Sequence, residues 1–104
     1  MTTFDDRERA FEDKYKHDEE LRFRVEVRRN KLLGLWAAEL LGRSDPEAYA
    51  KEVISADFEE PGDADLVRKI LDDLQDAGVE MSEHRLRNKM EECLTAAKDQ
   101  VMHE

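Results

Sequence analysis

The chain has 104 residues, enough for one small domain with a short tail and too few for a two-domain enzyme. Charged residues make up 42% of the sequence and hydrophobic residues 39%, and the 4 glycines and 2 prolines are too few for a many-stranded sandwich or barrel, so the composition favours an all-helical fold with a thin core. The formal net charge of −10 argues against general affinity for nucleic acid or anionic lipid and favours a protein partner.

Residues 3–20 are predicted to form a first helix that is amphipathic but weakly apolar. Residues 1–20 hold 8 acidic and 4 basic side chains. At about 100° per residue, Phe4, Phe11 and Tyr15 fall within about 40° of one another and form one narrow aromatic stripe. A charged solvated tail is the usual meaning of such a segment, but tails do not usually align aromatic rings. Because so narrow a stripe anchors a helix weakly, we expect this arm to be frayed or detached in the free protein.

Residues 21–41 are predicted to form the central helix of the domain, because apolar side chains follow two of its faces. Residues 21–27 alternate as a strand would, but the helical pattern on both sides favours a continuous helix. Gly34 stands between two leucines and predicts a close crossing by another helix. Trp36 lies among leucines at helical spacing and is expected to anchor the core, and Gly42 is expected to end the helix.

Three further helices are predicted after this one, the first of them running to about Phe58 with its apolar side chains inward. Their limits are set by capping residues, proline and glycine: Ser44, Asp45 and Pro46 at the first start, residues 59–62 at its end, Asp63 or Asp65 at the second start, Ala77 and Gly78 at its end, and Ser82 at the third start. The sequence therefore predicts an all-α fold: a small four-helix bundle over residues 21–104, with a partly disordered N-terminal helical arm over residues 1–20.

The basic residues of the chain gather in the central helix. Residues 21–43 hold 6 basic and 2 acidic side chains, whereas residues 44–104 hold 17 acidic and 7 basic ones. Such a cluster can clamp a phosphate or an acidic partner, or it can pair with the acidic helices of the same chain, which is the more frequent arrangement. The candidate phosphate-binding residues are Arg22, Arg24, Arg28, Arg29 and Lys31.

No motif for catalysis or metal binding is found, so we expect neither catalytic residues nor a metal site. The phosphate-binding loops, the nucleophile elbow and the zinc-binding helix motif are all absent. His17, His84 and His103 lie too far apart for a local set of ligands. The acidic residues between positions 57 and 65 do not have the spacing of a calcium loop and are better explained as helix ends and caps.

The sequence also predicts a cytoplasmic location. It has no apolar run near the ~20 residues of a membrane span, and its first residues lack the basic and apolar stretches of a signal peptide. Cys93 is the only cysteine, so it has no partner for an internal disulfide, which agrees with a reducing compartment. We expect Cys93 to be a small buried side chain rather than a reactive thiol.

The sequence resembles the zeta subunit family of the alphaproteobacterial F1-ATPase, formerly described as a domain of unknown function. The matching stretches are TTFDDRERAFEDKY, HDEELRFR, RRNKLLGLWAAELLG and YAKEVISADFEEPGDAD, which together span nearly the whole chain. The resemblance implies a four-helix bundle with an inhibitory N-terminal arm. It also implies that this arm inserts between catalytic subunits of F1 and blocks rotation in the direction of ATP hydrolysis.

Carried over by position, the inhibitory arm is residues 1–19, and the implied partners are the α, β and γ subunits of F1. No cofactor is required, and the free protein is expected to be a monomer, held at the inner membrane only through F1. Members of the family also bind adenine nucleotide weakly, so the alternative is a free-standing sensor domain that binds ATP or ADP at the basic cluster. The implied partner-binding residues are Phe4, Asp5, Asp6, Arg7, Glu8, Phe11, Glu12 and Tyr15.

Overall fold

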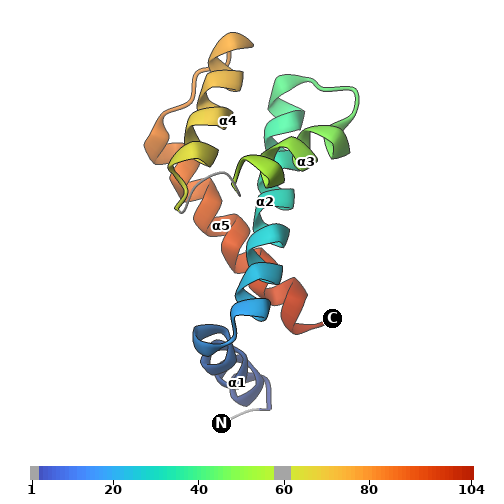
Figure 1. Ribbon diagram of the computed structural model, residues 1–104, viewed down its shortest axis with the longest axis vertical. Coiled ribbons are helices and arrows are strands. Elements are labelled where there is room, and N and C mark those ends of the chain that lie inside the picture. Colours follow the sequence, from blue (N-terminus) through green and yellow to red (C-terminus); the bar gives the residue numbers. More distant parts are fainter. Residues whose placement is uncertain (1–2, 58–61) are drawn as a thin grey trace.

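The computed structural model describes residues 3–57 and 62–104, with backbone only for residues 3–5. Over these residues the fold is all helical, as predicted, and it is elongated, measuring 48 × 26 × 26 Å (Figure 1). The helices are α1 (Thr3–His17), α2 (Glu19–Leu41), α3 (Pro46–Ala56), α4 (Ala64–Asp76) and α5 (Glu83–Met102).

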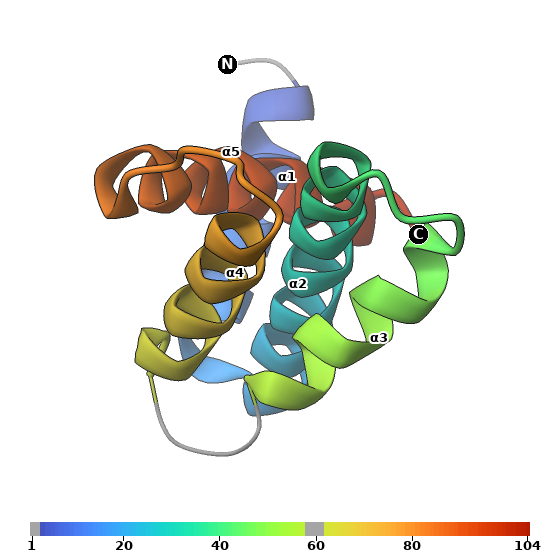
Figure 2. The same ribbon diagram turned by 90° about the horizontal axis from the view of Figure 1, so that it is seen from above.

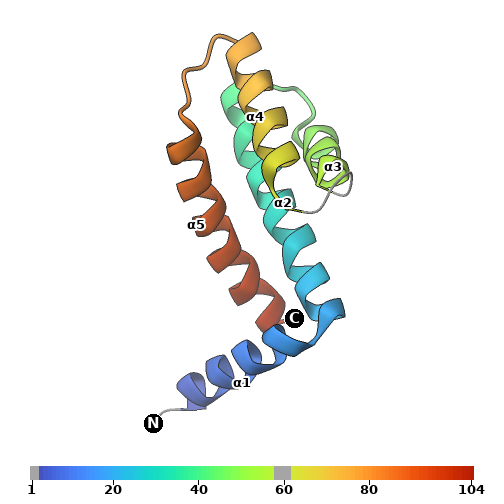
Figure 3. The same cartoon turned by 60° about the vertical axis from the view of Figure 1, so that its left-hand side comes forward.

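The central helix α2 organises the fold, and each of the other helices packs against it (Figures 1 and 2). Its most extensive contacts are with α3 and α5, which lie on different sides of it (Figure 3). The predicted four-helix bundle is not confirmed, because α3 has 11 residues and α4 has 13 against the 23 of α2. These two short helices flank the C-terminal part of α2, whereas its N-terminal part meets α1 and the end of α5 (Figure 3).

The core is divided into two clusters along α2. The larger one joins α2 to α3, α4 and α5 through buried side chains such as Leu33, Ile70 and Leu86. The smaller one consists of Leu21, Val25, Ala97 and Val101, from the start of α2 and the end of α5. The half-buried side chain of Leu32 packs against both clusters and connects them.

Two sequence-based predictions about the core have different outcomes. Cys93 is buried in the larger cluster as predicted, and burial raises the pKa of its thiol. Trp36 is only partly buried at the edge of that cluster, with Lys89 Nζ 5.5 Å from its ring centroid, so the prediction that it anchors the core is wrong. Tyr49 holds the central position instead: it is 1% exposed, and its hydroxyl donates a 2.8 Å hydrogen bond to Asp73.

The first predicted helix ends earlier than residue 20. Asp18 leaves the helical conformation, with φ −105° and ψ 104°, and its carboxylate accepts a hydrogen bond from the Leu21 amide at 3.1 Å. It therefore caps the N-terminus of α2, where Glu19 and Glu20 also favour the positive end of the helix dipole. The chain bends at this residue, and α1 runs in a different direction from α2 (Figure 3).

The other predicted helix ends agree with the structure where they fall on described residues. Asp45 and Ser82 cap α3 and α5 through side-chain hydrogen bonds to the backbone, and Gly42 ends α2 in the left-handed conformation with φ 69°. The helix α3 ends at Ala56. The predicted continuation of this helix to Phe58 and its stop signal at residues 59–61 lie outside the described residues.

Gly34 marks the close crossing of α2 and α3, as its position in the sequence predicts. A Cβ atom at this residue would lie 2.7 Å from the Cα of Ala50 and 3.3 Å from the Cβ of Val53. The nearest atom belongs to the backbone of α3 and is not free to rotate away. The absent side chain is therefore what allows the two helices to approach.

We predict that Gly34→Ala destabilises the protein by about 1–3 kcal/mol, because α3 has to move away from α2. In a helix with open space beside it, the same change is stabilising by about 1 kcal/mol. Urea unfolding followed by circular dichroism measures the difference. The control Lys31→Ala, on an exposed part of the same helix, should stay within about 0.5 kcal/mol of wild type. A Gly34→Ala protein at least as stable as wild type would contradict the close crossing.

Candidate functional site

The predicted partner-binding residues all lie on α1. This helix occupies one end of the elongated molecule, joined to α2 through Asp18 (Figures 1 and 3). Phe4 and Asp5 belong to the helix, but their side chains lie outside the described part of the structure. Of the others, Asp6, Arg7 and Glu8 are exposed, and Phe11, Glu12 and Tyr15 are partly buried.

The aromatic face of α1 lies against the bundle, which differs from the expectation of a detached arm. The rings of Phe11 and Tyr15 stack with centroids 6.4 Å apart, and both pack against the smaller core cluster. Lys98 of α5 adds two polar contacts: its Nζ is 3.3 Å from a carboxylate oxygen of Glu12 and 4.4 Å from the ring centroid of Tyr15. Aromatic burial, an ion pair and a cation–π contact together hold α1 in this position.

Residues of α1 and α5 line a groove of about 990 Å³ at this contact, and Phe11, Glu12 and Lys98 form part of its lining. Its walls are mainly charged. Each wall carries charges of both signs: Glu8, Arg9, Asp13 and Lys16 on α1, and Glu92, Lys98 and Asp99 on α5. The arm rests on the bundle through a small set of side chains, namely Phe11, Tyr15 and the Glu12–Lys98 pair.

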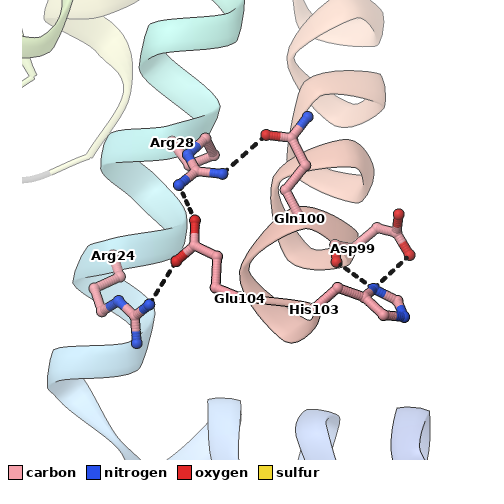
Figure 4. Close-up of polar contacts among 6 residues, drawn as sticks. All are labelled: Arg24, Arg28, Asp99, Gln100, His103 and Glu104. Atoms are coloured by element: carbon pink, nitrogen blue, oxygen red, sulfur yellow. Dashed lines mark hydrogen bonds and ion pairs between the residues drawn. The ribbon is translucent and has the colours of Figure 1, made fainter.

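Two arginines of the basic cluster bind the end of the chain (Figure 4). Glu104 accepts a hydrogen bond from Arg24 at 2.6 Å and pairs with Arg28 through its other carboxylate oxygen. Arg28 also donates a 3.0 Å hydrogen bond to Gln100. The hydrogen bonds from Arg28 and Arg24 lower the pKa of the Glu104 carboxyl. These contacts fix the end of α5 beside the N-terminal half of α2.

A third arginine of the cluster lies in the protein interior. Arg29 is 7% exposed, and its guanidinium lies 3.0 Å from Asp63 and 3.7 Å from Asp57. Its neighbour Asn30, 1% exposed, accepts a hydrogen bond from Arg29 Nε at 3.0 Å and donates one to Asp57 at 2.8 Å. This network ties α2 to the residues that leave α3 and enter α4. Arg29 is therefore a structural residue whose charge is paired with Asp57 and Asp63 inside the folded chain.

The basic cluster is therefore divided, and three of its members have acidic partners within the chain. Arg22 and Lys31 are exposed. One pocket of about 220 Å³ still brings part of the cluster together, and its lining residues include Phe23, Arg24, Arg28, Lys31 and the carboxylate-bearing Glu104. Phosphate binding by the cluster stays a prediction, and this pocket is the place to test it.

Two further observations concern residues 3–57 and 62–104. Within these ranges, His, Cys, Asp and Glu side chains form no group of three that would hold a metal ion. Within the same ranges, no helix combines the length and the apolar character that a bilayer crossing requires.

The contact between Glu104 and the two arginines makes a prediction about pH. In the folded protein the Glu104 pKa lies below its usual value, so the contact is fully present above the pKa of the unfolded chain and is lost as the pH falls through the folded pKa. An NMR titration of the side-chain carboxyl should give a lowered pKa in the wild type and a higher one in Arg28→Ala. The exposed Arg68 of α4 supplies the control Arg68→Ala, which should leave the titration unchanged. Identical titrations in all three proteins would show that Glu104 is not held by Arg28.

Known proteins resemble this chain at the level of fold and family. No match is found among curated proteins. One solved structure, described as a solution NMR structure, is 47% identical to this chain, covers 80% of it and 96% of its own length, and superimposes with a TM-score of 0.70. The family described as ATPase inhibitor subunit zeta matches residues 1–100. The resemblance seen in the sequence is thereby confirmed, and the chain belongs to the ATPase inhibitor subunit zeta family.

Proposed function

We propose that this protein is a regulatory subunit that inhibits ATP hydrolysis by F1-ATPase, and that it does so by inserting α1 between catalytic subunits. Membership of the ATPase inhibitor subunit zeta family supports the inhibitory role and F1 as the partner. The family also agrees with a regulatory protein rather than an enzyme. The insertion of α1 is the finer part of the proposal.

The observation that carries the insertion is the separation of α1 from α2 at Asp18. Because Asp18 caps α2 with its own side chain, α2 keeps its N-terminal hydrogen bond whatever direction α1 takes. The helix α1 carries aromatic rings on one face and charged residues elsewhere. A helix of this kind binds in a groove of its partner, with the aromatic rings as anchors. Insertion between the α, β and γ subunits of F1 would give Phe11 and Tyr15 such a groove.

The same proposal accounts for the division of the chain. Residues 1–20 enter F1, and residues 21–104 remain outside as the folded part that limits the depth of insertion. The protein then associates with the inner membrane through F1 alone, on its cytoplasmic side. It acts as a monomer, because one arm is sufficient to block rotation.

We predict that Phe11→Ala combined with Tyr15→Ala abolishes inhibition. Truncating a single anchor of a buried interface costs about 2 kcal/mol or more of binding, which corresponds to about thirty-fold weaker inhibition, and the double change exceeds this. ATP hydrolysis by purified F1, with increasing amounts of the variant added, measures the effect. The fluorescence of Trp36 during thermal unfolding should show that the larger core cluster stays folded, because both rings pack only against the smaller one.

Two single variants serve as controls. Asp13→Ala removes an exposed charge of α1, and it should weaken inhibition by about 1 kcal/mol or less, because exposed charges are screened. Leu40→Ala removes an exposed apolar side chain near the opposite end of α2 and should leave inhibition unchanged. If the double variant inhibits as well as wild type, α1 does not insert through its aromatic face.

A second candidate function is the binding of adenine nucleotide at the pocket of Arg24, Arg28 and Lys31. The observation that favours it is the meeting of three cations with the Phe23 ring, since guanidinium groups bind phosphate and aromatic rings stack on bases. The pocket is large enough for a phosphate group, so the base would lie on the exposed part of Phe23. A bound phosphate would compete with Glu104 for the two arginines.

We predict that Arg28→Ala weakens ATP binding about ten-fold, which is the effect of losing one charge-assisted contact to phosphate. NMR titration with ATP, following the amides of α2 and α5, measures the affinity. Arg68→Ala is the matched control and should bind as wild type does. Equal affinities of the two variants would exclude this pocket, and an unchanged spectrum of the wild type would exclude the nucleotide function.

A further inference from the structure

The aromatic rings that the arm would present to a partner already contact the bundle in the free chain. Phe11 and Tyr15 are partly buried against Leu21, Val25, Ala97 and Val101. The same ring faces cannot contact this cluster and the groove of a second protein at once. We propose that α2 and α5 form an intramolecular binding surface for α1, which holds the arm closed and makes its release a condition for binding F1. The part of this inference that concerns F1 rests on the proposed function.

Lys98 makes the polar contacts that hold the arm in the closed position. It extends from α5 and reaches both Glu12, at 3.3 Å, and the ring of Tyr15, at 4.4 Å from the centroid. Its side chain is 25% exposed, so both contacts are partly shielded from water and salt. One cation of the bundle therefore binds an acidic and an aromatic residue of the arm together.

Reversing the charge of Lys98 should weaken the closed state. Residues 1–20 carry 8 acidic and 4 basic side chains, and Lys98 lies on the α5 wall of the groove with Glu92 and Asp99. A glutamate at position 98 would add a third acidic side chain to this wall and would repel Glu12 instead of pairing with it. A single charge reversal can therefore shift the arm toward the open state.

The connection at Asp18 allows the arm to open without unfolding the rest. The backbone hydrogen bond from Asp18 N to Lys14 O ends α1, and the bond from Arg22 N to Asp18 O begins α2. A rotation of the backbone at this residue moves α1 while both helices keep their other hydrogen bonds. Opening exposes the smaller core cluster and leaves the larger one intact.

The closed arm lowers the apparent affinity for a partner by the fraction of molecules that are open. A variant that opens the arm should therefore bind F1 more tightly, although it makes no new contact with F1. If Lys98 had only a structural role, its loss would weaken binding to F1 or leave it unchanged. A higher affinity of the variant therefore distinguishes the proposed closed state from a structural role.

The test is Lys98→Glu in the full-length chain. Losing the ion pair and the cation–π contact should speed amide hydrogen exchange in residues 6–17 about five-fold. Exchange around Ile70 in the larger cluster should not change. The matched control is Lys89→Glu, also on α5, where the lysine lies over Trp36 and pairs with Glu92. Exchange in α1 that is equal in the two variants would overturn the closed arm.

The second measurement is inhibition of F1. The concentration of Lys98→Glu that half-inhibits ATP hydrolysis should fall by about the same factor as exchange rises, as long as the closed state is the major one. An unchanged or higher concentration, together with faster exchange, would show that opening is not a condition for binding. If neither the wild type nor the variant inhibits F1, the proposed function fails, and the exchange experiment alone still decides whether α1 is held by Lys98.

A cross-link tests the same inference in the opposite direction. Glu12→Cys and Lys98→Cys, in a Cys93→Ala background, can be joined by a short bis-maleimide that keeps the arm closed. The cross-linked protein should lose inhibition. The reference is the same double variant with both cysteines blocked by N-ethylmaleimide, which should inhibit more strongly than the cross-linked form. Because both preparations carry the substitution at the partner-binding residue Glu12, only the difference between them is compared. Equal inhibition by the two preparations would overturn the inference.

Discussion

The helix α2 has apolar side chains on more than one face and is stable in water only when other helices cover them. The close crossing at Gly34 lets α3 cover one face, since a side chain there would meet the Ala50 backbone. On another side α5 runs back along α2 from the larger cluster to the smaller one (Figure 3). The positions of the other helices follow from this requirement, because each contributes apolar residues to a core that α2 shares with all of them.

Charge supports this arrangement in two different ways. Arg29 is buried with Asp57 and Asp63 and fixes the chain between α3 and α4 against α2, where an unpaired charge would be costly. Arg24 and Arg28 remain near the surface and bind Glu104. In solvent such contacts are weak and exchangeable. One arginine of the cluster therefore stabilises the interior. The other two remain near the surface, where another anion can compete with Glu104 for them.

The arm combines two requirements that oppose each other. A helix of this length with few apolar residues is marginal alone, so packing of Phe11 and Tyr15 on the bundle stabilises it. A partner that uses the same rings must displace that packing. The small number of contacts and the bend at Asp18 keep the free-energy cost of this displacement small. An inhibitor that has to engage and release its target benefits from such a balance.

The sequence by itself determined the local features and the family. Asp45, Ser82 and Gly42 end helices through their own side chains or backbone freedom, so these positions can be read from a short window of residues. Asp18 carries the same kind of signal, followed by two glutamates, but the predicted first helix ran through it to residue 20. Only the tertiary structure decided that Tyr49 rather than Trp36 fills the core, and that Lys98 and Glu104 bind residues far away in the chain. These pairings depend on how α5 packs against α1 and α2, and such packing is set by the summed burial of many side chains rather than by any single residue.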